Sequence, residues 1–112
     1  MIRTLGEVLS VSVKGKDRVA RFGGEEFAIL LPHTPVSGAC ALAEIIRSAV
    51  AKVRIRRTNG PELAAVTVSL GVAAYRAGES GEEFINRADV ALYASKRNGR
   101  NRVTLYSEDI AA

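Results

Sequence analysis

A glycine pair between two apolar segments constrains the fold of this chain more than any other feature. Gly23 and Gly24 separate residues 17–22 from residues 27–31, and both segments have the apolar character of strands. A Gly-Gly pair in such a place predicts a tight hairpin, because the primed turns that join antiparallel strands need positive φ angles. Glycines also let the phosphates or ribose of another molecule approach the main chain closely.

Two carboxylates, Glu25 and Glu26, follow the glycine pair directly. Successive residues of a strand point to opposite faces, so only one of the two can be central to a single site on the sheet. From the residues alone, two interpretations remain open. The carboxylates are either solvated side chains of an ordinary hairpin or the place where a metal-bound nucleotide sits.

The composition indicates a single domain. With 112 residues, of which 47% are hydrophobic, the chain can bury one modest core. The single cysteine, Cys40, cannot form an internal disulfide and falls in an apolar helical stripe, which favours a buried thiol. The longest apolar stretch, residues 63–75, is too short to span a bilayer, and no targeting segment is recognisable. We therefore expect a cytoplasmic protein without membrane contact.

The net charge of +4 admits an anionic partner but is far below that of a dedicated duplex-binding protein. The chain has no Trp and only scattered tyrosines, so it lacks a base-stacking platform, and we expect no nucleic-acid partner. His33 stands alone, without a second His or Cys for a zinc site. Basic residues gather in two clusters, Arg54, Arg56 and Arg57 in one, and Lys96, Arg97, Arg100 and Arg102 in the other.

Hydrophobic periodicity predicts helices alternating with strands. Apolar residues at helical spacing predict an amphipathic helix over residues 2–12 and a second helix over residues 34–53. A β-branched run predicts a strand over residues 66–73. Turn chemistry predicts a bend at residues 59–61.

The last third of the chain carries clear helix boundaries. Ser80 and Glu83 have the spacing of a capping box, and Gly99 is placed to end the helix that this box opens. Residues 102–106 predict a final strand. The buried face of this helix is expected to carry Phe84, Ala88, Ala91 and Ser95. The whole order predicts an α+β fold, with helices packed on an antiparallel-rich sheet.

The string Arg-Phe-Gly-Gly-Glu-Glu-Phe at residues 21–27 resembles the signature of the GGDEF family, the bacterial diguanylate cyclases. Further stretches fall where that family has its other motifs, and the resemblance runs from about residue 2 to residue 106: residues 17–20, 68–73, 88–93 and 96–101. It implies the palm-like fold of nucleotidyl cyclases, of the ferredoxin-like type. In that family one more strand and helix precede the region matched here, so residues 1–112 are expected to form a single, partial GGDEF domain with its first strand and helix missing.

The resemblance implies condensation of two GTP molecules into cyclic di-GMP with release of pyrophosphate, assisted by Mg²⁺ or Mn²⁺. Glu25 is then the metal ligand and a catalytic residue, and Glu26 a supporting catalytic acid. Gly23 and Gly24 are nucleotide-binding residues, because they let the nucleotide lie against the backbone.

Lys96 and Arg100 match the basic pair that binds the terminal phosphates in the family, and both are expected to project from the end of one helix. The ordinary alternative is that cations at a helix end are favoured by the carbonyl dipole alone. Because each domain binds one GTP, the resemblance implies a homodimer, at least during turnover.

Two departures from the family pattern bear on activity and on feedback inhibition. The missing first strand bears an Asp that ligates the metal in the family, so we expect the isolated chain to be catalytically inactive. The inhibitory Arg-x-x-Asp of the family is replaced by a pattern with Lys14 and Asp17, a degenerate site. Lysine lacks the planar fork of arginine, so we expect weak or absent feedback by cyclic di-GMP.

The missing strand is internal in the family, between the signature hairpin and the strand at residues 66–74. We therefore expect that strands re-pair directly, or that the segment of a neighbouring chain fills the gap in a strand-exchanged oligomer. Three functions remain open: a diguanylate cyclase module, a non-catalytic module that binds GTP or cyclic di-GMP or dimerises, and, less favoured, a nucleic-acid-binding domain.

Overall fold

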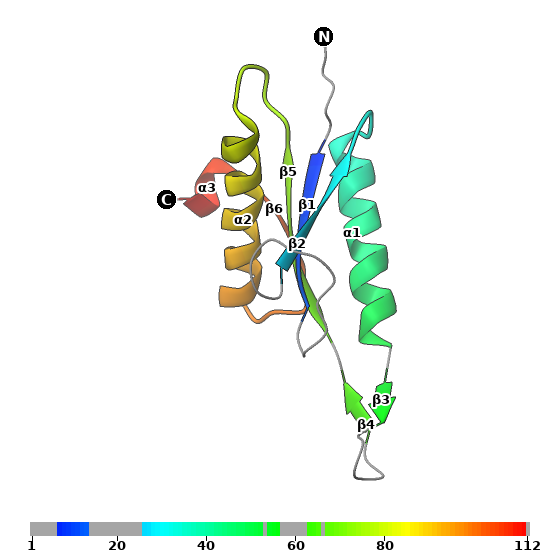
Figure 1. Cartoon of the computed structure of the whole chain (residues 1–112). Coiled ribbons are helices and arrows are strands. Elements are labelled where there is room, and N and C mark those ends of the chain that lie inside the picture. The colour runs from blue at the N-terminus through cyan, green and yellow to red at the C-terminus, as the bar shows by residue number, and fades with distance from the viewer. Residues whose placement is uncertain (1–6, 14–25, 53, 57–62, 66, 112) are drawn as a thin grey trace.

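The fold is described by a computed structural model that covers residues 7–13, 26–52, 54–56, 63–65 and 67–111. Four strands form one sheet in the order β2-β1-β5-β6, and two short strands form a separate sheet beyond the ends of α1 and β5 (Figure 1). The elements in chain order are β1 (Glu7–Val13), β2 (Glu26–Leu31), α1 (Val36–Ala51), β3 (Arg54–Arg56), β4 (Leu63–Ala65), β5 (Val68–Ala74), α2 (Gly81–Arg97), β6 (Val103–Leu105) and α3 (Glu108–Ala111).

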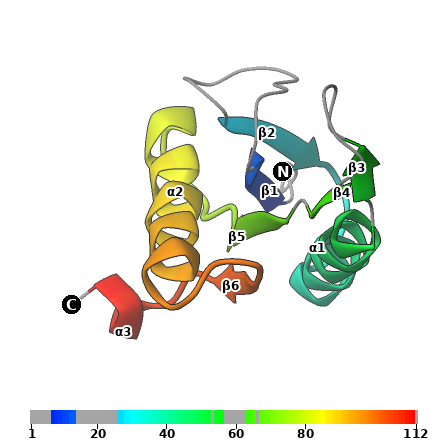
Figure 2. The same cartoon turned by 90° about the horizontal axis from the view of Figure 1, so that it is seen from below.

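The predicted α+β class with an antiparallel-rich sheet is confirmed. β1 runs antiparallel to both β2 and β5, whereas β6 runs parallel to β5. The two long helices α1 and α2 cover opposite faces of this sheet (Figure 2). β5 is therefore buried on both sides, which is why its sequence is a continuous run of small and apolar residues.

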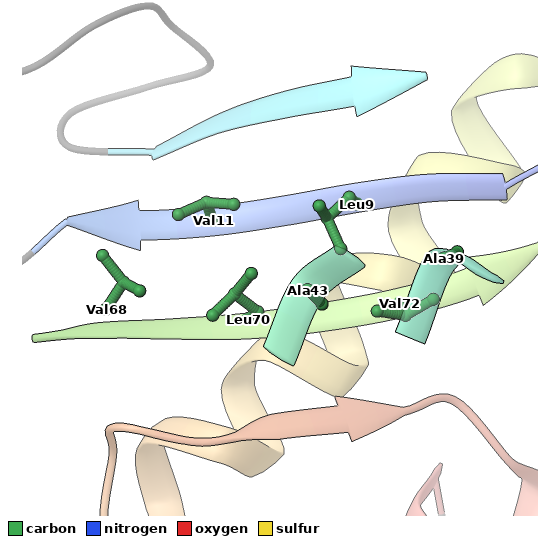
Figure 3. Close-up of a cluster of buried hydrophobic side chains, with 7 residues drawn as sticks. All are labelled: Leu9, Val11, Ala39, Ala43, Val68, Leu70 and Val72. Atoms are coloured by element: carbon green, nitrogen blue, oxygen red, sulfur yellow. The ribbon is translucent and has the colours of Figure 1, made fainter. Parts of the chain in front are cut away.

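The larger core cluster lies between β1, β5 and α1 (Figure 3). Successive residues of β5 divide between the two helices, because side chains alternate along a strand. Leu70 and Val72 belong to the cluster on the α1 side, whereas Ala73 packs with residues of α2. The buried members of the larger cluster are Leu9, Val11, Ala39, Ala43, Val68, Leu70 and Val72.

The amphipathic helix predicted over residues 2–12 is wrong where the structure describes it, because Glu7–Val13 forms the strand β1. The segment satisfies two periods at once. Leu9 and Val11 alternate with Ser10 and Ser12, as expected of a strand. The apolar residues over residues 2–12 also recur at helical spacing, so the pattern fits both elements equally. Tertiary pairing decides, since β1 is bonded on both sides and buries Leu9 and Val11 almost completely.

The predicted direct re-pairing across a missing internal strand is also wrong. β1 lies between β2 and β5, in the place where the resemblance put the absent strand. β2 and β5 are not neighbours in the sheet, and no segment of a second chain is needed between them. The internal strand is β1, which belongs to the segment that was predicted to be a helix.

The remaining predicted elements are confirmed where they are described. α1 and β5 lie close to the expected ranges, and β6 falls within residues 102–106. The short pair β3 and β4 and the last turn α3 were not predicted. The strand predicted over residues 17–22 and the turn at residues 59–61 lie outside the described residues. Neither α1 nor α2, nor any other described helix, is long and apolar enough to cross a bilayer.

The capping box at the start of α2 is confirmed by both of its hydrogen bonds. The Glu83 backbone N–H donates to Ser80 Oγ at 3.0 Å, and the Ser80 backbone N–H donates to Glu83 Oε1 at 2.9 Å. The predicted inward face of the helix is confirmed too, since all four of its expected residues are buried: Phe84, Ala88, Ala91 and Ser95.

The small residues on this face let the α2 backbone lie directly on β5. A Cβ added at Gly71 would overlap the main-chain nitrogen of Leu92 and the main-chain oxygen of Ala88, and would lie 2.8 Å from the carbonyl carbon of Ala91. These obstacles are backbone atoms, so a rotamer change cannot relieve them. Glycine at position 71 therefore sets the distance between α2 and the sheet.

We expect Gly71→Ala to lower the free energy of unfolding by about 3 kcal/mol, because overpacking of a rigid contact forces the helix away from the strand. Gly81→Ala is the matched control, since nothing lies within 4 Å of a Cβ added at Gly81. Urea denaturation of both variants checks the prediction. Equal stability of the two variants would contradict the packing described here.

An ion pair joins the start of α2 to the turn before it. Arg87 Nε donates to Glu79 Oε1 at 3.1 Å, and Arg87 Nη2 donates to Glu79 Oε2 and to the backbone oxygen of Ala74. The two side chains are only 12% and 10% exposed. The Arg87 guanidinium also lies over the ring of Tyr106, 5.3 Å from its centroid, which ties the C-terminal segment to α2.

The pKa of Glu79 lies below its ordinary value of 4.5. Burial by itself raises this pKa, but the hydrogen bonds from Arg87 and from the Arg76 backbone N–H outweigh it. Because the pKa is lower in the folded than in the unfolded chain, the contribution of Glu79 to stability is present above about pH 4.5. It is lost as the pH falls through the folded pKa.

We expect Glu79→Gln to reduce the loss of stability that accompanies acidification from about pH 7 to about pH 3. It should also destabilise the chain at neutral pH by about 3 kcal/mol, because Arg87 is left as a poorly compensated buried charge. Urea denaturation at both pH values measures the two effects, with Asp109→Asn as the exposed-carboxylate control. An unchanged acid dependence in Glu79→Gln would refute the assignment.

Candidate functional site

One end of the four-stranded sheet gathers the segments that the sequence marks as functional. β2 begins at Glu26, which pairs with Ser12 in β1, and Ser12 pairs with Ser69 in β5. Two strand spacings of roughly 5 Å each therefore separate the Glu26 and Ser69 backbones. The Asn101 backbone N–H donates to Ser69 Oγ at 3.2 Å. The start of β2 and the loop after α2 thus lie at the same end of the sheet.

The predicted basic pair reaches this end from two different elements. Lys96 is half-buried in the last turn of α2, but the helix ends at Arg97, and Arg100 lies in the following loop. The expectation that both side chains project from one helix is therefore wrong. Both residues belong to the segment that lies at the end of the sheet where β2 begins, and Arg100 is exposed to solvent.

The loop that carries Arg100 has an uncommon main-chain conformation. Gly99, Arg100 and Asn101 have φ angles of 123°, 64° and 49°. Gly99 follows the C-cap residue Asn98, which confirms that it ends the helix. Left-handed backbone is disfavoured for a residue with a Cβ, although asparagine tolerates it better than most. Arg100 must therefore be held in this conformation by its surroundings.

Hydrogen bonds from β5 and α2 hold both ends of the loop. The Arg100 backbone N–H donates to the Ser95 backbone oxygen at 2.8 Å, and the Leu70 N–H donates to the Arg102 oxygen at 2.9 Å. Ser95 is fully buried, and its hydroxyl donates to the Leu70 oxygen at 2.8 Å while lying 2.7 Å from Thr104 Oγ1. The helix end, the loop and two strands are thereby joined around Ser95.

A residue of α1 also contacts the loop. Arg47 Nη1 donates to Asn101 Oδ1 at 3.0 Å, while Arg47 Nε donates to both carboxylate oxygens of Glu44, at 3.0 and 3.1 Å. The hydrogen bond from Arg47 holds the pKa of Glu44 below its ordinary value. The helices on the two faces of the sheet are thus connected at this end through Asn101.

Four of the residues that build this loop were not predicted to have this role. An asparagine directly after Gly99 is a known signal for left-handed backbone, and it could have drawn attention to Asn101. Ser69 and Ser95 look like ordinary small residues on packed elements. The contact of Arg47 with Asn101 joins residues 54 positions apart, so no local pattern announces it.

Several predicted site residues fall in segments that the structure does not describe. Lys14, Asp17, Gly23, Gly24 and Glu25 lie outside the described residues, and only the backbone of Glu26 is described. Their roles remain predictions. Within the part of the chain that the structure describes, no three His, Cys, Asp or Glu side chains are placed to hold a metal ion.

Comparison with known proteins identifies the family. The family model described as "Diguanylate cyclase, GGDEF domain" matches residues 1–102. The chain belongs to the GGDEF-domain family.

Curated relatives agree with this assignment. Diguanylate cyclase DgcM of Escherichia coli (strain K12) is 48% identical over 99 residues, which make up 88% of this chain and 23% of that protein. Diguanylate cyclase A of Treponema denticola is 40% identical over 111 residues, or 98% of this chain and 29% of that protein. The chain thus spans only about a quarter of the length of these relatives.

Solved structures show the same fold. The GGDEF domain of DgcB from Caulobacter crescentus, in complex with c-di-GMP, matches with a TM-score of 0.80 at 33% identity, over 91% of this chain and 76% of that chain. The active GGEEF domain of a diguanylate cyclase from Vibrio cholerae matches with a TM-score of 0.76 at 27% identity, over 94% of this chain and 85% of that chain.

Proposed function

We propose that this chain forms part of a diguanylate cyclase domain, which condenses two GTP molecules into cyclic di-GMP and releases two pyrophosphates. One observation carries the proposal: Lys96 and Arg100 belong to the helix end and the loop that lie at the end of the sheet where β2 begins, and β2 directly follows the glycines and Glu25 in the sequence. The family match supplies the class of reaction. The relatives' own names, as diguanylate cyclases, support the same activity.

The reaction sets the chemical needs of the site. Each 3′-hydroxyl attacks the α-phosphate of the other nucleotide, so catalysis requires positioning and neutralisation of phosphate charge. Glu25 and Glu26 offer hard carboxylate oxygens, which fit Mg²⁺ or Mn²⁺. Glu26 is the first residue of β2, and the backbone of β2 begins at the end of the sheet that carries Lys96 and Arg100, which supports this location for the carboxylates. A bound divalent cation neutralises charge on the phosphates.

Each residue that matches a family motif then has a role in the proposal. Glu25 holds the cation and helps to deprotonate the attacking hydroxyl, while Glu26 supports it. Gly23 and Gly24 let the nucleotide lie against the main chain. Lys96 and Arg100 bind the terminal phosphates. The guanidinium of Arg100 is suited to this because its planar fork can donate two parallel hydrogen bonds to phosphate oxygens.

Product formation requires two such domains. Each domain binds one GTP, and the two nucleotides must face each other, so the working form is a homodimer. Feedback by cyclic di-GMP is proposed to be weak, because Lys14 replaces the arginine that would pair with Asp17 in the inhibitory pattern.

The 112-residue polypeptide by itself is proposed to be inactive. Ser12 is the residue of β1 that pairs with Glu26, so the strand beside the signature offers a hydroxyl at this end and no carboxylate. Mg²⁺ bound through one or two carboxylates loses much of its attachment when one is absent. The same observation favours a second candidate function, a module that binds GTP without turning it over.

We expect the purified 112-residue chain to form no cyclic di-GMP above background from GTP and Mg²⁺ or Mn²⁺. Chromatographic detection of the product tests this, with an active GGDEF-domain protein in parallel as the positive control. A measurable rate from the chain alone would show that the carboxylates of the signature suffice.

We expect Lys96→Ala and Arg100→Ala each to weaken GTP binding about tenfold, because each removes a charge-assisted hydrogen bond to phosphate. Arg76→Ala is the matched control, since it removes an arginine paired with Glu108 at the opposite end of α2. Calorimetric titration with GTP and Mg²⁺ gives the affinities. If the site variants bind like the control, the phosphate-binding role is excluded.

A further inference from the structure

We propose that Arg47 is a positioning residue, which acts through Asn101 to fix the direction in which Arg100 leaves the loop. The meaning of this inference for catalysis rests on the proposed function, because it takes Arg100 to be a phosphate-binding side chain. The structural part of the inference, that Arg47 orders the loop, stands on the geometry alone.

The loop needs an external constraint because its own preferences oppose it. Arg100 and Asn101 are adjacent, both carry a Cβ, and both have positive φ angles. Residues held in such conformations relax unless several contacts over-determine them. The hydrogen bond from Arg100 N–H to Ser95 O fixes the helix side of the loop. The carbonyl oxygen of the peptide that follows Arg100 accepts a long, solvent-exposed hydrogen bond from Arg102 Nε at 3.3 Å, which restrains this peptide weakly.

Asn101 restrains that following peptide from two directions. Its backbone N–H donates to Ser69 Oγ at 3.2 Å, a long bond, and its side-chain oxygen accepts from Arg47 Nη1 at 3.0 Å. Because Asn101 follows Arg100 directly, fixing the Asn101 backbone restrains the ψ angle of Arg100. This angle sets the direction of the Arg100 Cα–Cβ bond relative to the following peptide. Arg47 supplies the side-chain half of this restraint.

Arg47 is itself held in one orientation. Glu44 accepts from its Nε and Nη2, so the third nitrogen, Nη1, is left directed at Asn101. The Arg47 side chain is only 22% exposed, which limits the alternatives open to it. A lysine has no fork and cannot contact Glu44 and Asn101 in this fixed geometry. The arrangement therefore requires arginine.

Such a restraint matters for binding a polyphosphate. Two parallel hydrogen bonds from one guanidinium to phosphate oxygens form only when the guanidinium plane is aligned with those oxygens. Ordering the loop in advance removes the entropy loss that binding would otherwise incur. Arg47, which lies on α1 across the sheet from α2, thereby contributes to affinity without touching the nucleotide.

Amide hydrogen exchange of the free chain tests the structural part. In Arg47→Ala we expect the Asn101 amide to exchange roughly tenfold faster than in the parent chain, because one of its two anchors is lost. The Leu92 amide in α2 should keep its exchange rate. In Arg47→Lys, the Asn101 amide should exchange at a rate between those in the parent chain and in Arg47→Ala. Arg76→Ala, which removes the same charge elsewhere, should leave Asn101 unchanged. If Asn101 exchanges alike in Arg47→Ala and in Arg76→Ala, the inference is overturned.

GTP binding tests the link to Arg100. We expect Arg47→Ala to weaken GTP binding about fivefold through loss of pre-organisation, and to have no further effect in the Arg100→Ala background. A general loss of structure would weaken binding in both backgrounds, so equal effects would overturn the positioning role. If Arg100→Ala leaves the affinity for GTP unchanged, Arg100 does not bind the phosphates and this part of the proposed function is wrong. The exchange rates then still decide whether Arg47 orders the loop.

Discussion

The direct contact between the α2 backbone and β5 at Gly71 is the constraint on which the rest of the structure depends. With no side chain at this position, the helix settles onto main-chain atoms of the strand. At that distance the Ser95 hydroxyl reaches the Leu70 oxygen, and the loop after α2 reaches Ser69. A glycine in the middle of β5 therefore determines where the basic end of α2 lies relative to the start of β2.

Much of this fold could be predicted because local signals agreed with tertiary packing. The capping box at Ser80 and Glu83 defines the start of α2 regardless of its neighbours, and the alternating burial of β5 follows from its apolar run. Residues 7–13 could not be assigned in this way. They fit a helical and a strand period equally, and pairing with two neighbouring strands decides the outcome.

The site was predictable to a smaller extent, and for different reasons. The resemblance at residues 96–101 indicated Lys96 and Arg100, but it could not show that α2 ends before Arg100 or that three successive residues have positive φ angles. The contact between Arg47 and Asn101 depends on two helices on opposite faces of the sheet. Contacts of this kind follow from the assembled fold, and no local pattern encodes them.

We propose that the end of the sheet where β2 begins and α2 ends is a nucleotide site. Backbone amide chemical shifts of the chain, followed during a titration with GTP and Mg²⁺, test it most directly. We expect the amide resonances of Glu26, Lys96 and Arg100 to shift together with one dissociation constant. Shifts confined to the opposite end of α2, around Ser80 and Phe84, with Lys96 and Arg100 unmoved, would contradict it.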